Sequence, residues 1–182
     1  MKKVIFTSLL SLAFLAPSQA EAAWGFTAHQ GVDIAAKQQQ YMSPMEYLPT
    51  IDYKAGKVLI QFDALETIAS LGREDLMNFG LNGYYTVSKG EINSNFDGVL
   101  QMGASIDLQQ DNTIEDAEHN NIYALAQARM GAQSAKKFGI GIYVVPGIGI
   151  ANVPALEQDG DEYEMETELA VGTGLQISVW TK

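Results

Sequence analysis

The sequence contains no cysteine, and this absence excludes three kinds of structure. No disulfide can staple the fold, no thiolate can bind a metal ion, and no lipid can be attached to a cysteine at a lipoprotein cleavage point. A domain of this size without disulfides has to rest on extensive backbone pairing or on a well-packed core.

The chain also lacks an apolar run long enough for a membrane-spanning helix, which takes about 20 residues. The apolar run Val4–Ala16 has 13 residues, follows two lysines and precedes two small-x-small motifs. That order is typical of a signal peptide, cut after Ala20 or after Ala22. We therefore predict an exported protein, with a signal peptide at 1–22 and a single domain at 23–182.

Positive charge is scarce. The chain has 11 Lys and Arg against 22 Asp and Glu, a formal net charge of −11. Nucleic acids are bound by clustered Lys and Arg, and the sequence has no such cluster. The composition therefore excludes nucleic acid as a partner.

The chain after the signal peptide also lacks helical periodicity, because no stretch repeats apolar residues at helical spacing over several turns. Apolar or β-branched residues instead alternate with small or polar ones, which is the pattern of a strand with two unlike faces. The clearest alternating segments are Leu76–Ser88, Asn95–Gln109, Phe138–Asn152 and Glu162–Trp180. The less regular ones are Tyr47–Lys54, Lys57–Ala69 and Asn121–Ser134, the last of which has alanines that also suit a helix.

The connections between these segments alternate between short and long. The short ones fall at Ala55-Gly56, at Lys89-Gly90 with its neighbours, and at 135–137, and the long ones fall at 71–75, 111–120 and 154–161. In an up-and-down meander this places tight turns at one end and larger loops at the other, as in outer-membrane barrels. Most lysines fall at the tight-turn end and many acidic residues fall in the long loops.

Seven strands are visible, and single-chain bacterial barrels have an even number. An upward strand should precede Tyr47–Lys54, and Trp24–Ala35 is the candidate for it. We therefore predict an all-β fold, an antiparallel up-and-down β-barrel of about eight strands.

The composition of the two faces indicates which of them meets water. A soluble barrel has an apolar interior and an outer face rich in charged side chains. Here the second face is mostly Gly, Ala, Ser, Asn and Gln, and Arg129 is the one cation in the middle of a strand. Small polar residues suit the narrow bore of an eight-stranded barrel. We predict that the apolar face points outward to lipid; the alternative is a soluble periplasmic lipocalin-like barrel that binds an apolar ligand.

With its signal peptide, alternating strands, alternating loop lengths and lack of cysteine, the chain resembles the small outer-membrane β-barrels of Gram-negative bacteria. The resemblance covers most of the predicted mature chain and lies in pattern rather than in a motif. It implies a monomer in contact with outer-membrane lipids. One departure concerns the terminal aromatic that usually ends the last strand. Here Trp180 is followed by Thr181 and Lys182, and it lies on the opposite face from Ile177 and Val179.

Acidic residues are the main candidates for a site. In the last segment Glu162, Glu164, Glu166 and Glu168 share one face. With Arg129 we take Glu164, Glu166 and Glu168 as candidates for the lumen or its rim. The alternatives are a solvated strand extension and pairing with Arg129 inside the bore.

The long loops hold candidate oxygen ligands for a divalent cation, namely Asp111, Glu115, Asp116, Asp159 and Asp161. Their spacing matches no EF-hand loop, so a plain acidic loop is the alternative.

For catalysis only His29 and His119 are available as histidines. Neither has a serine within two residues, and no G-x-S-x-G motif occurs. We predict a non-enzymatic protein without a cofactor that acts in a structural role or through its acidic loops.

Overall fold

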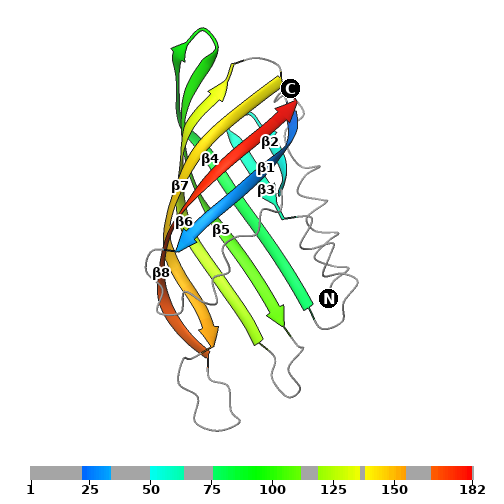
Figure 1. The fold of residues 1–182 in the computed structure, drawn as a ribbon, viewed down its shortest axis with the longest axis vertical. Coiled ribbons are helices and arrows are strands. Elements are labelled where there is room, and N and C mark those ends of the chain that lie inside the picture. The colour runs from blue at the N-terminus through cyan, green and yellow to red at the C-terminus, as the bar shows by residue number, and fades with distance from the viewer. Residues whose placement is uncertain are drawn as a thin grey trace.

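The computed structural model describes residues 22–33, 50–63, 76–111, 119–135, 138–154 and 165–181. Eight strands close into one barrel in sequence order (Figure 1), and every neighbouring pair is antiparallel, including β1 with β8. The strands are β1 (Ala22–Asp33), β2 (Thr50–Ala55), β3 (Val58–Phe62), β4 (Leu76–Asn93), β5 (Phe96–Asp111), β6 (His119–Ser134), β7 (Phe138–Pro154) and β8 (Met165–Thr181). The predicted eight-stranded up-and-down barrel is confirmed.

Two uncertain segments are strands. The predicted strand Trp24–Ala35 is β1, which pairs with β8 from Trp24 opposite Thr181 to Asp33 opposite Gly172. The alanine-rich segment is β6, paired along its length with β5. Pairing with two neighbours overrides the helix propensity of its alanines, because packing outweighs a weak local preference.

The short turn predicted at Lys89-Gly90 with its neighbours is present, but it lies further along the chain than Lys89-Gly90. β4 continues to Asn93, and the turn lies at residues 94–95. Asn93 decides this position, because its Oδ1 accepts hydrogen bonds from the backbone N of Asn95 and Phe96, at 2.9 and 3.1 Å. The β4–β5 hairpin therefore reaches beyond the other tight turns at the top of Figure 1.

The predicted turn at Ala55-Gly56 is confirmed, and the predicted turn at 135–137 lies mostly outside the described residues. Gly56, between β2 and β3, has φ 57°, a left-handed conformation that glycine adopts without strain. Lys54 and Lys57 lie at this tight-turn end, as expected. Residues 1–21, 34–49, 64–75, 112–118 and 155–164 lie outside the described residues, so the predicted signal peptide and the acidic loops are expectations that the fold does not address. No described helix is long and apolar enough to cross a membrane.

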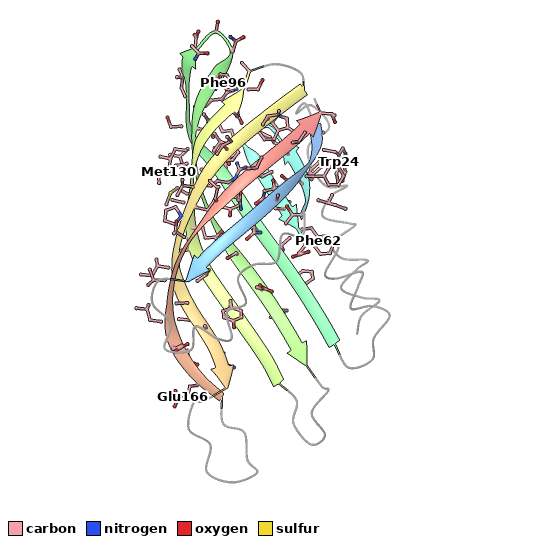
Figure 2. The ribbon with its side chains drawn as sticks, in the orientation of Figure 1. Trp24, Phe62, Phe96, Met130 and Glu166 are labelled. Atoms are coloured by element: carbon pink, nitrogen blue, oxygen red, sulfur yellow. The ribbon has the colours of Figure 1, made fainter. Side chains whose placement is uncertain are left out.

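The apolar side chains point away from the bore. Leu175 and Ile177 are each 45% exposed, and Trp24 and Met130 project from the outer wall (Figure 2). Other large apolar side chains on this face are Phe26, Ile51, Met102, Ile106, Ile122, Ile140, Ile142, Val144, Ile148, Ile150 and Leu169. The opposite face of each strand is buried inside. It combines polar and small side chains with an apolar cluster of Leu59, Tyr84, Val99, Tyr143, Val145 and Trp180. The predicted inside-out arrangement of the two faces is confirmed.

Trp180 is one of the large aromatics on the inner face, together with Tyr84, Tyr123 and Tyr143. It faces inward near the tight-turn end and is 6% exposed. Glycines make room for it: a Cβ on Gly139 would lie 2.0 Å from Trp180 Nε1, and one on Gly141 would lie 2.7 Å from the indole ring. Trp180 therefore lies on the face opposite Ile177 and Val179, as its position in the sequence predicts.

We predict that Gly139→Ala lowers the free energy of unfolding by about 1–3 kcal/mol, the usual effect of overpacking. The indole is rigid and enclosed, so the added methyl forces the ring or the strand to shift. Urea unfolding followed by circular dichroism measures the change. Gly83→Ala is the matched control, because a Cβ at Gly83 meets nothing within 4 Å. Equal effects of the two substitutions would refute the packing of Trp180 on Gly139.

Candidate functional site

A layer of buried polar side chains crosses the bore toward the tight-turn end. Its two charged members are Arg129 on β6 and Asp52 on β2, which are 2% and 3% exposed. Five neutral polar side chains from four strands surround them: Thr27, Gln61, Gln101, Gln176 and Ser178. Strand alternation explains their direction, because each is flanked by residues that face outward. We call these seven residues the polar layer.

Arg129 is held on all sides. Its Nε donates to Gln176 Oε1 at 2.7 Å, its Nη2 donates to Ser178 Oγ at 2.7 Å, and its Nη1 donates to Gln101 Oε1. The guanidinium carbon also lies 3.2 Å from the centroid of the Tyr143 ring, a stacking contact that suits a planar cation. These contacts compensate for the removal of the charge from water.

Asp52 is satisfied in the same way by neutral donors. Its carboxylate accepts hydrogen bonds from Thr27 Oγ1, from Thr50 Oγ1 at 2.7 Å and from Gln61 Nε2 at 3.2 Å. A buried carboxylate is tolerated where several donors surround it.

Neutral side chains connect the two charges. Ser178 Oγ, which accepts from Arg129, lies 2.6 Å from Thr27 Oγ1, and Thr27 donates to Asp52. A parallel path leads from Arg129 through Gln176, whose Nε2 donates to Gln61 Oε1 at 3.3 Å, and on to Asp52. The polar layer is therefore one connected network in which opposite charges balance at a distance.

This arrangement fills the bore with side chains. An eight-stranded barrel has an interior just wide enough to be filled in this way. The network joins β1, β2, β3, β5, β6 and β8 across the barrel. It therefore fills the bore and links the strands to one another. Its hydrogen-bonding groups are engaged with one another, which leaves no activated nucleophile or base in the layer.

The glutamate candidates lie far from the polar layer. Glu166 is exposed and Glu168 half-buried, both near the loop end of β8. Gln176, which binds Arg129, follows Glu168 by eight residues, roughly 26 Å along an extended strand. Pairing of these two glutamates with Arg129 inside the bore is therefore wrong. Glu164 lies outside the described residues.

The remaining candidates are not brought together. His29 faces inward on β1, opposite Gln176 of β8, and is half-buried. Asp111 and His119 are paired at the loop ends of β5 and β6. Within the described strands no group of three His, Asp or Glu side chains is placed to hold a metal ion. The divalent-cation site stays a prediction, because Glu115, Asp116, Asp159 and Asp161 lie outside the described residues.

Sequence reasoning missed Asp52. Its signal was present, because Asp52 stands between Ile51 and Tyr53 in a predicted strand and so has to face the bore. Its partners could not be found in this way. Thr27 and Gln61 reach Asp52 only through the register of β1, β2 and β3.

No protein-family model matches the chain, and no curated protein matches it. Among solved structures, the crystal structure of Neisserial surface protein A (NspA) is similar, with 8% sequence identity and a TM-score of 0.43 over 88% of this chain and 96% of that chain. At this level the likeness carries no argument.

We predict that Arg129→Met lowers the free energy of unfolding by about 3–5 kcal/mol, because it leaves the Asp52 charge buried without its balancing cation. Asp52→Asn should destabilise the barrel as well, and the double variant should lose less than the sum of the two single losses. Urea unfolding of the four proteins measures this coupling. Strictly additive losses would show that the two charges act independently.

Proposed function

We propose that the protein is a small, non-enzymatic outer-membrane β-barrel of a Gram-negative cell envelope. In this proposal it acts in a structural role or through contacts made by its acidic loops. The observation that carries the proposal is the outward direction of the apolar side chains around a closed sheet. Exposure of such an apolar surface to water costs free energy, whereas its contact with the hydrocarbon of a bilayer does not.

The height of the apolar surface supports insertion in a membrane. On β7 the outward residues run from Ile140 to Ile150. Ten steps of about 3.3 Å along a strand tilted by about 40° give a height of about 25 Å, which is the apolar band of outer-membrane barrels. Closure matters here too, because an open sheet edge in hydrocarbon leaves backbone groups unpaired at several kcal/mol each.

Aromatic residues mark one border of this band. Near the tight-turn end the rings of Trp24 and Tyr53 lie 4.9 Å apart, and Lys57 Nζ lies 5.7 Å from the centroid of the Tyr85 ring. Tyrosine and tryptophan favour the boundary between lipid and water. By analogy with other barrels, the tight turns face the periplasm and the long loops face outward.

The filled bore limits what the protein does. The buried side chains of the polar layer occupy the bore at its level, which disfavours a role as a general pore. The polar interior also argues against the alternative of a soluble lipocalin-like barrel, because charged and amide side chains do not bind an apolar ligand. Function is therefore assigned to the outer wall and to the loop end.

We expect the purified protein in detergent to run at a different gel mobility before and after boiling, because a closed membrane barrel resists unfolding by detergent alone. In cell fractionation the mature chain should stay with the membranes after washing with alkaline carbonate. Recovery of the folded chain in the aqueous periplasmic fraction without detergent would refute membrane insertion and favour the soluble alternative.

A second prediction concerns the outer wall. Leu175 lies midway along β8 and faces outward, so Leu175→Arg should destabilise the inserted barrel by about 2–4 kcal/mol, the effect of arginine at the centre of a bilayer. Thr181→Arg is the control on the same face of the same strand, and near the interface it should change stability by no more than about 1 kcal/mol. Unfolding in lipid vesicles measures both. A soluble barrel would show no such dependence on depth.

A further inference from the structure

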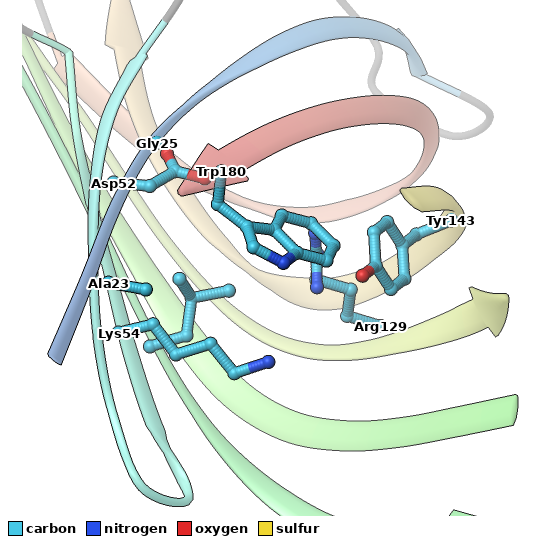
Figure 3. A pocket seen from close by; sticks show the side chains of 8 residues that line it. Ala23, Gly25, Asp52, Lys54, Arg129, Tyr143 and Trp180 are labelled. Atoms are coloured by element: carbon cyan, nitrogen blue, oxygen red, sulfur yellow. The ribbon is translucent and has the colours of Figure 1, made fainter. Parts of the chain in front are cut away.

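A small cavity lies inside the bore, at the tight-turn side of the polar layer (Figure 3). Trp180 of β8, Tyr143 of β7 and Asp52 of β2 lie on its wall. The small residues Ala23 and Gly25 of β1 leave room for it. Its volume is about 10 Å³, which is close to the least that holds one water molecule. The cavity is therefore too small for a halide, a phosphate or an organic ligand, and its size fits water.

One group on the wall is a donor that lacks an acceptor. Within the part of the chain that the structure describes, the buried Nε1 of Trp180 makes no hydrogen bond, although the N–H of a buried indole usually finds an acceptor. Figure 3 shows this nitrogen on the edge of the ring that faces Lys54. A ligand of the cavity therefore has to accept a hydrogen bond from Trp180.

The two cations on the wall are already engaged. Arg129 is held by three side chains of the polar layer. Lys54 donates to Gln133 Oε1 at 3.3 Å, and its Nζ lies 5.3 Å from the centroid of the Trp180 ring. We therefore assign neither cation to the ligand, and a neutral ligand fits the site.

Two acceptors complete the site. The carboxylate of Asp52 has about four acceptor positions, and neighbouring side chains fill three of them. The hydroxyl of Tyr143 donates to Gln133 Oε1 at 3.3 Å, and its oxygen can also accept a hydrogen bond. A molecule that accepts one hydrogen bond and donates two would join Trp180 to both acceptors, and water has this capacity.

We propose that the cavity holds one buried water molecule, which accepts a hydrogen bond from Trp180 Nε1–H and donates to Tyr143 Oη and to Asp52. About three hydrogen bonds are typical of a buried water in a protein. The water links the end of β8 to β7 on one side and to β2, beyond β1, on the other. It therefore reinforces the wall where the barrel closes. This inference goes beyond the proposed function and does not depend on it, because the water lies inside the bore.

Nuclear magnetic resonance of the folded protein in detergent tests the proposal. The chain has two tryptophans, and Trp24 lies on the outer wall, so Trp24→Phe leaves Trp180 as the single indole N–H signal. We expect a cross-peak between this N–H and water, with opposite signs in nuclear Overhauser and rotating-frame Overhauser spectra. A water that is held by the protein gives this pattern, whereas chemical exchange of the proton gives equal signs.

Tyr143→Phe, added to Trp24→Phe, removes one acceptor of the water and keeps the ring that packs against Arg129. It should weaken the cross-peak about threefold or more, the equivalent of one lost hydrogen bond. Tyr84→Phe is the matched control. Tyr84 is also buried beside Arg129, but its hydroxyl donates to Gln127 Oε1 at 2.6 Å and it does not line the cavity. The control should leave the cross-peak unchanged.

Absence of the cross-peak in Trp24→Phe, or equal signs in the two spectra, would overturn the proposal, because Trp180 would then hold no water. Equal weakening by Tyr143→Phe and Tyr84→Phe would overturn it as well, since this result would indicate a general loosening of the interior. The measurement on Trp24→Phe alone needs no substitution inside the bore, so it decides the matter even where Tyr143→Phe fails to fold.

Discussion

The pairing of β1 with β8 is the constraint on which the rest of the structure depends. It joins the two ends of the sheet, so that each strand is paired on both sides over part of its length and the barrel has a closed wall. In a closed barrel one face of every strand becomes part of the outer wall and the other face becomes part of the bore. The alternation of side chains along each strand therefore sets the composition of both surfaces. An apolar outer wall and a polar bore follow directly.

A bore this narrow has to be filled, and its filling explains the polar layer. Large side chains such as Arg129 and Tyr143 occupy the centre, and small ones such as Ser178 and Gly141 make room for them. The buried charges are tolerated because amide and hydroxyl groups satisfy them. At the level of the polar layer the bore is therefore filled with side chains.

The two ends differ in chemistry. Lys54, Lys57 and the indole of Trp180 lie at the tight-turn end, whereas Glu166 and Glu168 lie toward the loop end. This polarity follows from the strand order, because tight turns and long loops alternate along the chain.

The sequence by itself determined the strand pattern, the outward face of residues such as Ile140 and Leu175, and the inward position of Arg129 and Trp180, whereas the count of eight also needed the rule that single-chain bacterial barrels have an even number of strands. These features can be predicted because the two-residue period of a strand depends only on the residues of that strand and not on the strands beside it. The tertiary structure alone decided that Asp52 balances Arg129 and that Gly139 packs against Trp180. Those contacts join residues distant in the chain, and they depend on the register of strands around a closed barrel, which no local pattern encodes.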